Sequence, residues 1–545
     1  MLILLAWATL SYSWSVDTGS SQLWITQLAS TIFLAVIASR LSKEDVLDYI
    51  IPITLISASF AAVIAIGQSF GFNPLSFRLL HSSTPSSTFI NPNYAANYFD
   101  LITPAALAFL LLQPTSSKFM RWLAATAFAA TLSCLIICQS RGSWLGLFVE
   151  LIALAFVCLR APEFRKLFIA AVRRNSRPLI IALAIVAGII YRPLYHPSKA
   201  PNAEKTESIL TMTADTSIME RLHVYQNALV GIADHPLLGV GYGAFIMGFS
   251  PYVDAVHPTG VTKLSTYRFM HSDPLQMFFE LGLPGGLLSL AIYFLAIAMC
   301  WRIIRSTADN QRRFLGMGLF LALIASGAHA SVDFPLHLPT SAFYFWLWIG
   351  LVTGLYLHIF TPKIIRLPRI MLVMAGTAGL VFTVYSTPLY AGYLKANRDV
   401  FTAMQNAIHR NCDAVFRYSD KAMNEFGRDH YTRFWYAQVY TYCNAPAQKR
   451  LAAMNRIIAL DPNMPLPYLT RAQLELAKGD LENAASDFNH YRKLLPHAPE
   501  GYVGLAKIVL RLGHKTQARY WVGLALKHSP NDPEAKQLAK QLNLK

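Results

Sequence analysis

A short segment from Arg268 to Gln276 brings an arginine and a histidine to an expected helix start. Asp273 is expected to cap this helix, with Pro274 in its first position and Gln276 completing a capping box. Unpaired N–H groups and the helix dipole at such an end favour an anion such as a phosphate. Histidine ordinarily titrates near about 6.5, so His271 can accept a proton at neutral pH. A lone histidine is usually structural, but this setting makes His271 and Arg268 candidates for chemistry on a phosphate-bearing ligand.

Two further segments place polar residues at the start of apolar runs. Asn91 and Asn93 flank a proline, and their amides could bind a hydroxyl-rich ligand or only cap the following helix. Arg141 lies beside Gly and Ser at the boundary of an apolar run, where a guanidinium is costly unless it meets an anion or a carboxylate. Glu150 in the same run is its possible structural partner. We favour an anion contact for Arg141.

A long polar loop, residues 196–270, precedes the His271 segment and contains Arg221 in the sequence Glu-Arg-Leu. Farther along this loop, residues 234–243 read DHPLLGVGYG. Glycines spaced in this way occur in nucleotide sites, but there they follow a strand. No strand is expected before residue 234, so we reject a nucleotide site. Glu280, after the capping segment, is expected to organise the helix face or to pair with an arginine.

The elements that must position these residues are membrane helices. The chain is 54% hydrophobic and 14% charged, whereas soluble proteins are about one quarter charged. The deficit of charged residues ends near residue 390. This change predicts a membrane domain, residues 1–389, and a water-soluble domain, residues 390–545, which is large enough for its own core. A bilayer needs about 17–25 apolar residues per helix. We predict about eleven spans, at residues 2–14 (short), 22–39, 46–70, 95–113, 119–138, 143–159, 178–195, 275–300, 314–331, 341–360 and 370–389.

The basic residues give the orientation of these spans. One alternate set of short loops holds nearly all of their lysines and arginines, whereas the other set holds only Arg78 and Arg141. Basic loops stay in the cytoplasm. We therefore expect a bacterial inner-membrane protein with a cytoplasmic N-terminus, and with loop 196–270 and the C-terminal domain in the periplasm. This topology explains the formal charge of +17, and no basic tract with interleaved aromatics indicates a nucleic-acid partner.

The C-terminal domain carries an internal repeat. Pro462, Pro496 and Pro530 are spaced by 34 residues, and so are Tyr468 and Tyr502. This period resembles the tetratricopeptide repeat, in which pairs of helices stack into a concave surface that binds partners. The stretch 398–460 is helical in pattern but fits the template poorly. The sequence thus predicts an all-α protein, with a protein partner at the repeat domain as one role and a structural lid as the alternative.

The six cysteines include no CxxC pair and no Cys/His cluster with metal spacing, so we predict no metal site. Four of them lie in apolar runs and are expected to be packing residues. Cys412 and Cys443 lie in the C-terminal domain, and an oxidising periplasm would allow a disulfide between them. Two unpaired buried thiols are the alternative.

The segment Met270 to Gln276, followed by Glu280-Leu281-Gly282, resembles the signature of the O-antigen ligase and polymerase superfamily. The stretch from Arg221 to residue 243 is similar to the segment that precedes this signature there. Asn91-Pro92-Asn93 and residues 331–339 resemble segments of members that bear tetratricopeptide repeats. This chain departs from many members at Ser272 and Pro274, where those have Asn and Tyr.

The resemblance implies transfer of a glycan from an undecaprenyl-diphosphate carrier to an acceptor hydroxyl, without a cofactor, a nucleotide sugar or a metal. It implies His271 as the base that takes the hydroxyl proton, with Arg141, Arg221 and Arg268 holding the diphosphate. We expect further substrate contacts at Asn91, Asn93, Gln276 and Glu280.

The acceptor is left open by the sequence. A ligase uses lipid A core, a polymerase uses another carrier-linked glycan, and a protein O-oligosaccharyltransferase uses a protein. A transporter with a scaffold domain is the alternative of another class, since Glu150 and Pro284-Gly285-Gly286 are features found in transporter spans.

Overall fold

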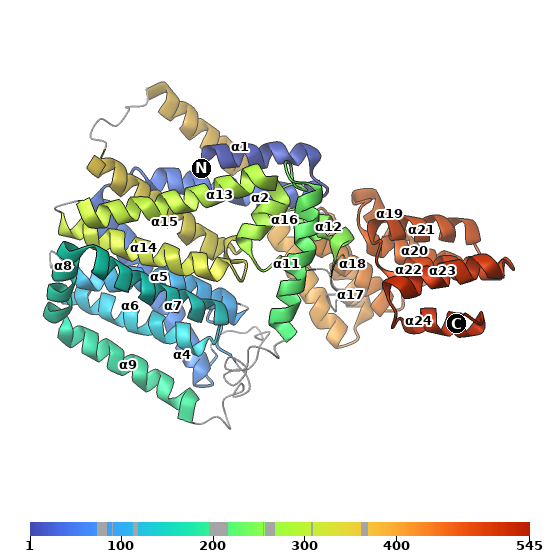
Figure 1. Ribbon diagram of the computed structural model, residues 1–545, viewed down its shortest axis with the longest axis horizontal. Coiled ribbons are helices and arrows are strands. Elements are labelled where there is room, and N and C mark those ends of the chain that lie inside the picture. The colour runs from blue at the N-terminus through green and yellow to red at the C-terminus, as the bar shows by residue number, and fades with distance from the viewer. Residues whose placement is uncertain are drawn as a thin grey trace.

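The computed structural model describes residues 1–73, 84–89, 91–112, 118–195, 216–253, 256, 267–306, 309–360 and 369–544. Every regular element in these ranges is a helix, which confirms the all-α class. Figure 1 shows two parts, a bundle of long helices and a smaller array of C-terminal helix pairs.

Eight helical stretches in the described ranges are long and apolar enough to cross a membrane. They include α2 (Thr18–Ala38), α5 (Pro92–Leu111), α6 (Lys118–Ile137), α7 (Arg141–Arg160), α13 (Asp273–Ser306), α14 (Asn310–Ala330) and α15 (Pro339–Phe360). The remaining one, Lys43–Ser69, is built from α3 (Lys43–Asp45), a π-helical turn (Val46–Ile50) and α4 (Ile51–Ser69). Eight of the predicted spans correspond to these helices.

The other three predicted spans are not counted among the eight. Span 178–195 lies in α9 (Ser176–Tyr195), which forms a pair with α8 (Pro162–Arg174), bent by 74°, and this pair would be a ninth span. The structure makes 2–14 a short apolar helix, α1 (Leu2–Leu10), continued by a 3-10 turn (Ser11–Trp14). Span 370–389 falls within α16 (Arg369–Ile408), but most of its side chains lie outside the described residues. Eleven spans therefore stay a prediction.

The helix α13 is broken at Gly282, whose φ of 66° and ψ of −174° are not helical. A Cβ at Gly282 would lie 2.4 Å from the carbonyl oxygen of Leu237, so only glycine fits this contact. The glycine-rich loop 236–243 runs along the break, where Val240 and Gly241 donate to the carbonyls of Phe279 and Glu280. The glycine string therefore packs against a broken helix, and this explains it without a nucleotide.

The C-terminal helices follow the 34-residue period. Helices α20 (Pro465–Lys478), α22 (Pro499–Arg511) and α24 (Pro533–Gln541) each begin at a proline, and α21 (Leu481–Leu494) and α23 (Lys515–His528) alternate with them. Before them lie α17 (Cys412–Phe426), α18 (His430–Tyr442) and α19 (Ala447–Leu460). Cys412 and Cys443 form a disulfide, so this prediction holds over the alternative of two free thiols. The disulfide closes the α17–α18 hairpin.

The two parts of the molecule contact each other near the start of α2. Asn463 donates to the carbonyl of Val16 over 3.1 Å, and Arg428 donates to the side chain of Gln22 over 3.3 Å. A Cβ at Gly19 would lie 2.2 Å from the carbonyl oxygen of Arg428, which shows how closely the backbones approach. Helix α16 runs through the expected domain boundary at residue 390 without interruption.

Candidate functional site

The centre of the candidate site is a histidine–carboxylate pair. His271 Nδ1 lies 3.0 Å from Asp333 Oδ1, and the side chain of His271 is 31% exposed while that of Asp333 is 8% exposed. Asp333 belongs to the turn between α14 and α15. The backbone of His271 has a φ of 59°, in the left-handed region that non-glycine residues seldom adopt. Strain of this kind persists only where surrounding contacts hold it, and it is common in functional sites.

A second pair crosses the first and holds the two segments together. His337 Nδ1 lies 2.6 Å from Asp273 Oδ1, and the backbone N–H of Leu336 donates to Asp273 Oδ2 over 2.8 Å. Both side chains are buried. Asp273 therefore binds the 331–338 segment instead of capping its own helix. The predicted capping box is wrong, because α13 already includes Asp273 and the Gln276 amide oxygen accepts from the N–H of Met270.

Helix α11 (Thr216–Asp234) holds the pair from the other side. Arg221 Nη1 donates to the carbonyl of Val332 over 2.5 Å, one residue before Asp333. One turn later, the hydroxyl of Tyr225 donates to the carbonyl of His271. The structure thus brings Arg221 and His271 to the same region, and Arg221 contacts the backbone that positions Asp333.

The pair continues into the membrane-spanning bundle. His329 Nε2 lies 3.7 Å from Asp333 Oδ2, and His329 Nδ1 lies 2.8 Å from Asp100 Oδ2. Ser143 donates to the same oxygen of Asp100 over 2.8 Å. His329 and Asp100 are each 1% exposed. We call His271, Asp333, His329 and Asp100 the His–Asp network, since imidazoles and carboxylates alternate along it.

Arg141 and Arg268 reach different parts of this region. Arg141 begins α7, directly before Gly142, where a Cβ would lie 2.5 Å from the ring of His329. This end of α7 therefore abuts the His–Asp network. The guanidinium of Arg268 instead lies 5.2 Å from the ring centre of Tyr431 and donates to Tyr393 over 3.4 Å. Arg268 thus contacts residues of the C-terminal domain, and its charge also acts on Tyr94 and His337.

The four remaining predicted residues make internal contacts. Asn91 accepts from the backbone N–H of Asn93 over 2.8 Å and caps α5, the helix that carries Asp100; capping was one of its two expected roles. Gln276 and Glu280 are buried, Gln276 donates to Glu280 over 2.9 Å, and Glu280 accepts from the N–H of Gly243 over 2.8 Å. The geometry therefore favours positioning over substrate contact for Gln276 and Glu280.

Two groups in the turn between α14 and α15 have shifted pKa values. Burial alone would raise the pKa of Asp333, but its contacts with His271 and His329 hold it well below its usual range. Burial opposes protonation of His337, yet its contact with Asp273 and the nearby charge of Glu280 raise the pKa of His337. Asp333 is therefore ionised at neutral pH.

An apolar cavity of about 250 Å³ lies beside the two crossing pairs. Asp273 and His337 line it together with side chains of the bundle helices, including Leu28, Met277, Phe294, Phe345 and Trp346. A mostly apolar lining with a few polar groups suits an amphipathic ligand with a lipid chain.

The network was only partly predictable. The sequence indicated His271, but His329, Asp100 and Tyr225 were missed, and Asp333 and His337 were noted only within the segment 331–339. One pattern in the sequence could have indicated the two crossing pairs. Residues 271–273 read His-x-Asp and residues 333–337 read Asp-x-x-x-His, so each segment offers one histidine and one aspartate to the other. Asp100 and His329 are 229 positions apart, and no local pattern joins them.

Fold and site together define a multi-pass membrane protein with a histidine–carboxylate site where its long helices end. Residues 126–290 match the O-antigen ligase family. This match supports the resemblance to the O-antigen ligase superfamily and a role as a cell-surface polysaccharide ligase or polymerase. The match includes Arg141, Arg221 and His271, while Asp100, His329 and Asp333 lie outside it. No curated protein matches this chain.

Proposed function

We propose that this protein transfers a glycan from an undecaprenyl-diphosphate carrier to an acceptor hydroxyl at the periplasmic face of the bacterial inner membrane. The observation that carries the proposal is the partly exposed His271 with its buried, ionised partner Asp333. The match to the O-antigen ligase family over the segment that contains His271 supports it.

In this reaction His271 acts as the general base. Its Nδ1 contacts Asp333, so we assign Nε2 to the acceptor hydroxyl. The hydroxyl gives its proton to Nε2 while its oxygen forms a bond to the anomeric carbon of the donor. The bond from that carbon to the phosphate oxygen breaks, and the electron pair leaves with the undecaprenyl diphosphate. Asp333 fixes the ring and stabilises the imidazolium, which then passes its proton to water or to the released diphosphate.

The arginines supply positive charge to the diphosphate. A guanidinium presents several N–H donors in a planar fork that fits phosphate oxygens. Arg221 uses Nη1 to hold Val332, and we assign its other N–H groups to the donor. We assign the same role to Arg141 at the start of α7. Arg268 faces the C-terminal domain, so its part in the clamp rests on the sequence prediction alone.

The lipid and the partners follow from the cavity and the repeat helices. We assign the first isoprene units of the carrier to the apolar cavity of about 250 Å³ beside Asp273 and His337. The C-terminal helices are proposed to be tetratricopeptide repeats. A groove of about 850 Å³ lined from α18, α20, α22 and α24 gives them a surface for a protein partner or for the growing glycan. Lipid A core, a carrier-linked glycan and a protein are the three acceptors to be tested.

The test is a gene deletion followed by analysis of lipopolysaccharide, secreted polysaccharide and protein glycans. Wild type and His271→Ala are returned separately, at matched membrane levels. We expect one glycan class to be lost or left on its carrier, wild type to restore it, and His271→Ala to restore none of it. The class that disappears names the acceptor. Full complementation by His271→Ala would refute the assignment of the base.

Transport is a second candidate, and one observation favours it. Asp100, Glu150 and His329 are ionisable side chains buried within spanning helices, a feature of ion and substrate pathways. The same deletion strain separates the two functions. If Asp100→Asn fails to complement while His271→Ala complements fully, transport is the better account.

A further inference from the structure

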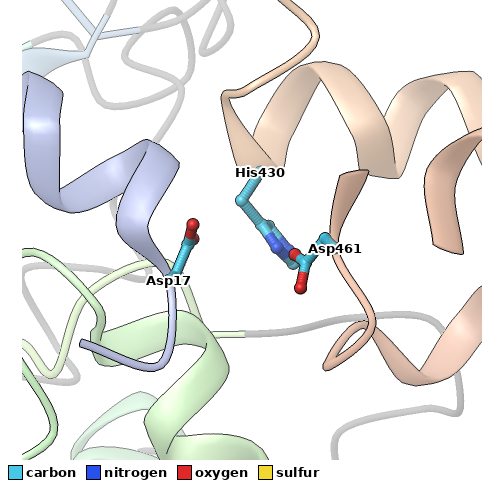
Figure 2. A group of neighbouring side chains, drawn as sticks. All are labelled: Asp17, His430 and Asp461. Carbon is cyan, nitrogen blue, oxygen red and sulfur yellow. The ribbon is translucent and has the colours of Figure 1, made fainter. Parts of the chain in front are cut away.

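Three side chains that the proposed transfer does not use meet where the membrane domain contacts the C-terminal domain. They are Asp17, His430 and Asp461, which we call the junction cluster (Figure 2). One donor atom from each lies within 4.8 Å of the others. Their residues are 5%, 4% and 5% exposed, so water reaches none of them freely.

His430 is the unusual member. Neither Nδ1 nor Nε2 has a hydrogen-bond partner among the described residues, although both atoms are buried. Figure 2 shows its ring directed toward Asp461, with Asp17 across from it. Leaving a buried polar atom unsatisfied costs about 1–3 kcal/mol, and buried polar groups without a partner are rare in native proteins. A ligand at this place would give the imidazole the partner that it lacks.

The charges of the junction cluster call for a cation as that ligand. Arg433 Nη2 lies 2.8 Å from Asp461 Oδ2 and 3.4 Å from Asp17 Oδ1. One guanidinium thus faces two carboxylates, which leaves an excess of one negative charge in a buried place. Each carboxylate also accepts a backbone N–H, Asp17 from Ser20 and Asp461 from Asn463. Carboxylate oxygens carry several lone pairs, so these contacts leave room for a metal bond.

We propose that the junction cluster binds a divalent transition-metal ion, with zinc the best fit. Imidazole nitrogen and carboxylate oxygen are normal zinc ligands, whereas calcium and magnesium prefer oxygen alone. The three side chains would supply three ligands, and a water molecule would complete a tetrahedron. The metal would compensate the excess charge and give His430 a partner at the same time.

The three ligands come from three distant elements. Asp17 caps the start of α2 in the membrane domain, His430 begins α18, and Asp461 ends α19. A metal here would therefore fasten the C-terminal domain to the membrane domain. It would lie outside the His–Asp network, and it takes no part in the proposed transfer. The spacing of these ligands along the chain explains why the sequence predicts no metal site.

The test uses the full chain, purified in detergent and stripped of metal with a chelator. Zinc binding is measured by calorimetry and by metal analysis after gel filtration, and the thermal unfolding temperature is recorded with and without zinc. His430→Phe keeps a planar aromatic ring and removes the ligand. His497→Phe, in the same domain, controls for adventitious binding to a partly exposed histidine. A second ligand variant, His430→Gln, covers the case in which the phenylalanine does not fit.

We expect about one zinc ion per wild-type chain and a zinc-dependent rise in the unfolding temperature. His497→Phe should keep both, whereas His430→Phe and His430→Gln should bind zinc at least about tenfold more weakly. Cobalt in place of zinc should give the visible absorption of a tetrahedral site in wild type only. Equal binding by wild type and both His430 variants, or no binding by wild type, would overturn the proposal. None of these measurements depends on transferase activity, so they stand apart from the proposed function.

Discussion

The His–Asp network and the junction cluster are made of the same residue types, yet their contacts differ. In the His–Asp network, His271 and His329 each lie beside a carboxylate, and His329 lies between two. In the junction cluster Arg433 contacts both carboxylates, and His430 has no hydrogen-bond partner among the described residues. A histidine that is hydrogen-bonded to a carboxylate can take up a proton. A histidine with no hydrogen-bond partner, beside two carboxylates that one arginine contacts, can bind a metal. The chemistry is decided by which cation the carboxylate faces.

Asp333→Asn would break this comparison most severely, since it leaves His271, like His430, without a hydrogen bond to a carboxylate. The amide keeps the shape of the side chain but cannot stabilise an imidazolium. We expect the transfer rate to fall by about 10²- to 10⁴-fold, with zinc binding unchanged. The rate is measured with purified protein and a lipid-linked donor. A rate within about twofold of wild type would show that His271 works without Asp333.

Arg221→Lys tests whether the guanidinium group of Arg221 binds the diphosphate. A lysine can still donate to the carbonyl of Val332, but it cannot also present a fork to a diphosphate. We expect transfer to fall by about 10²-fold with the thermal unfolding temperature nearly unchanged. Arg302→Lys is the matched control, because Arg302 lies at the far end of α13 and contacts Tyr356. Equal loss in both variants would argue against a diphosphate contact.

Gly142→Ala sharpens the comparison within the His–Asp network. Its Cβ would lie 2.5 Å from the ring of His329, which the packed bundle cannot easily move. We expect a loss of about 1–3 kcal/mol in the free energy of unfolding, together with reduced transfer. Gly188→Ala is the control, because no atom lies within 4 Å of a Cβ at Gly188 in α9. Unchanged stability in Gly142→Ala would mean that His329 is not held against α7.

The Asp273–His337 pair should give the smallest effect, which is a pH dependence of the stability of the folded protein. The pKa of His337 is raised in the folded protein, so its contribution to stability is fully present below about pH 6.5. It is lost as the pH rises through the folded pKa, with a slope of at most about 1.4 kcal/mol per pH unit. Unfolding temperatures between pH 6 and 9 should therefore fall more steeply for wild type than for His337→Gln. Parallel curves would exclude this role.

The parts of the fold that depend on local patterns could be predicted from the sequence. Apolar runs indicated eight of the described helical stretches, and the 34-residue period of Pro462, Pro496 and Pro530 recurs in the starts of α20, α22 and α24 at Pro465, Pro499 and Pro533. A histidine beside a helix start indicated His271. Each of these inferences uses residues close together in the chain.

Features set by distant residues were missed. Asp273 has the type and position of a helix cap, but its carboxylate contacts the distant His337 instead. The carbonyl of Leu237 lies against the break of α13 at Gly282, and no property of residues 273–306 shows that contact. Arg268 faces Tyr431, which is more than 160 positions away and belongs to the other domain.

Helix α16 is a continuous helix of 40 residues, from Arg369 to Ile408, and has one internal proline, Pro388. At 1.5 Å per residue it is about 60 Å long, roughly twice the thickness of the hydrocarbon core. The length of α16 therefore affects the distance of the C-terminal domain from the predicted span 370–389, and its helical phase affects the rotation of that domain about the helix axis. Inserting a single residue after Pro388 would turn the C-terminal domain by about 100° and raise it by about 1.5 Å. The phase of this helix, together with the contacts at the start of α2, thus sets which way the repeat groove points.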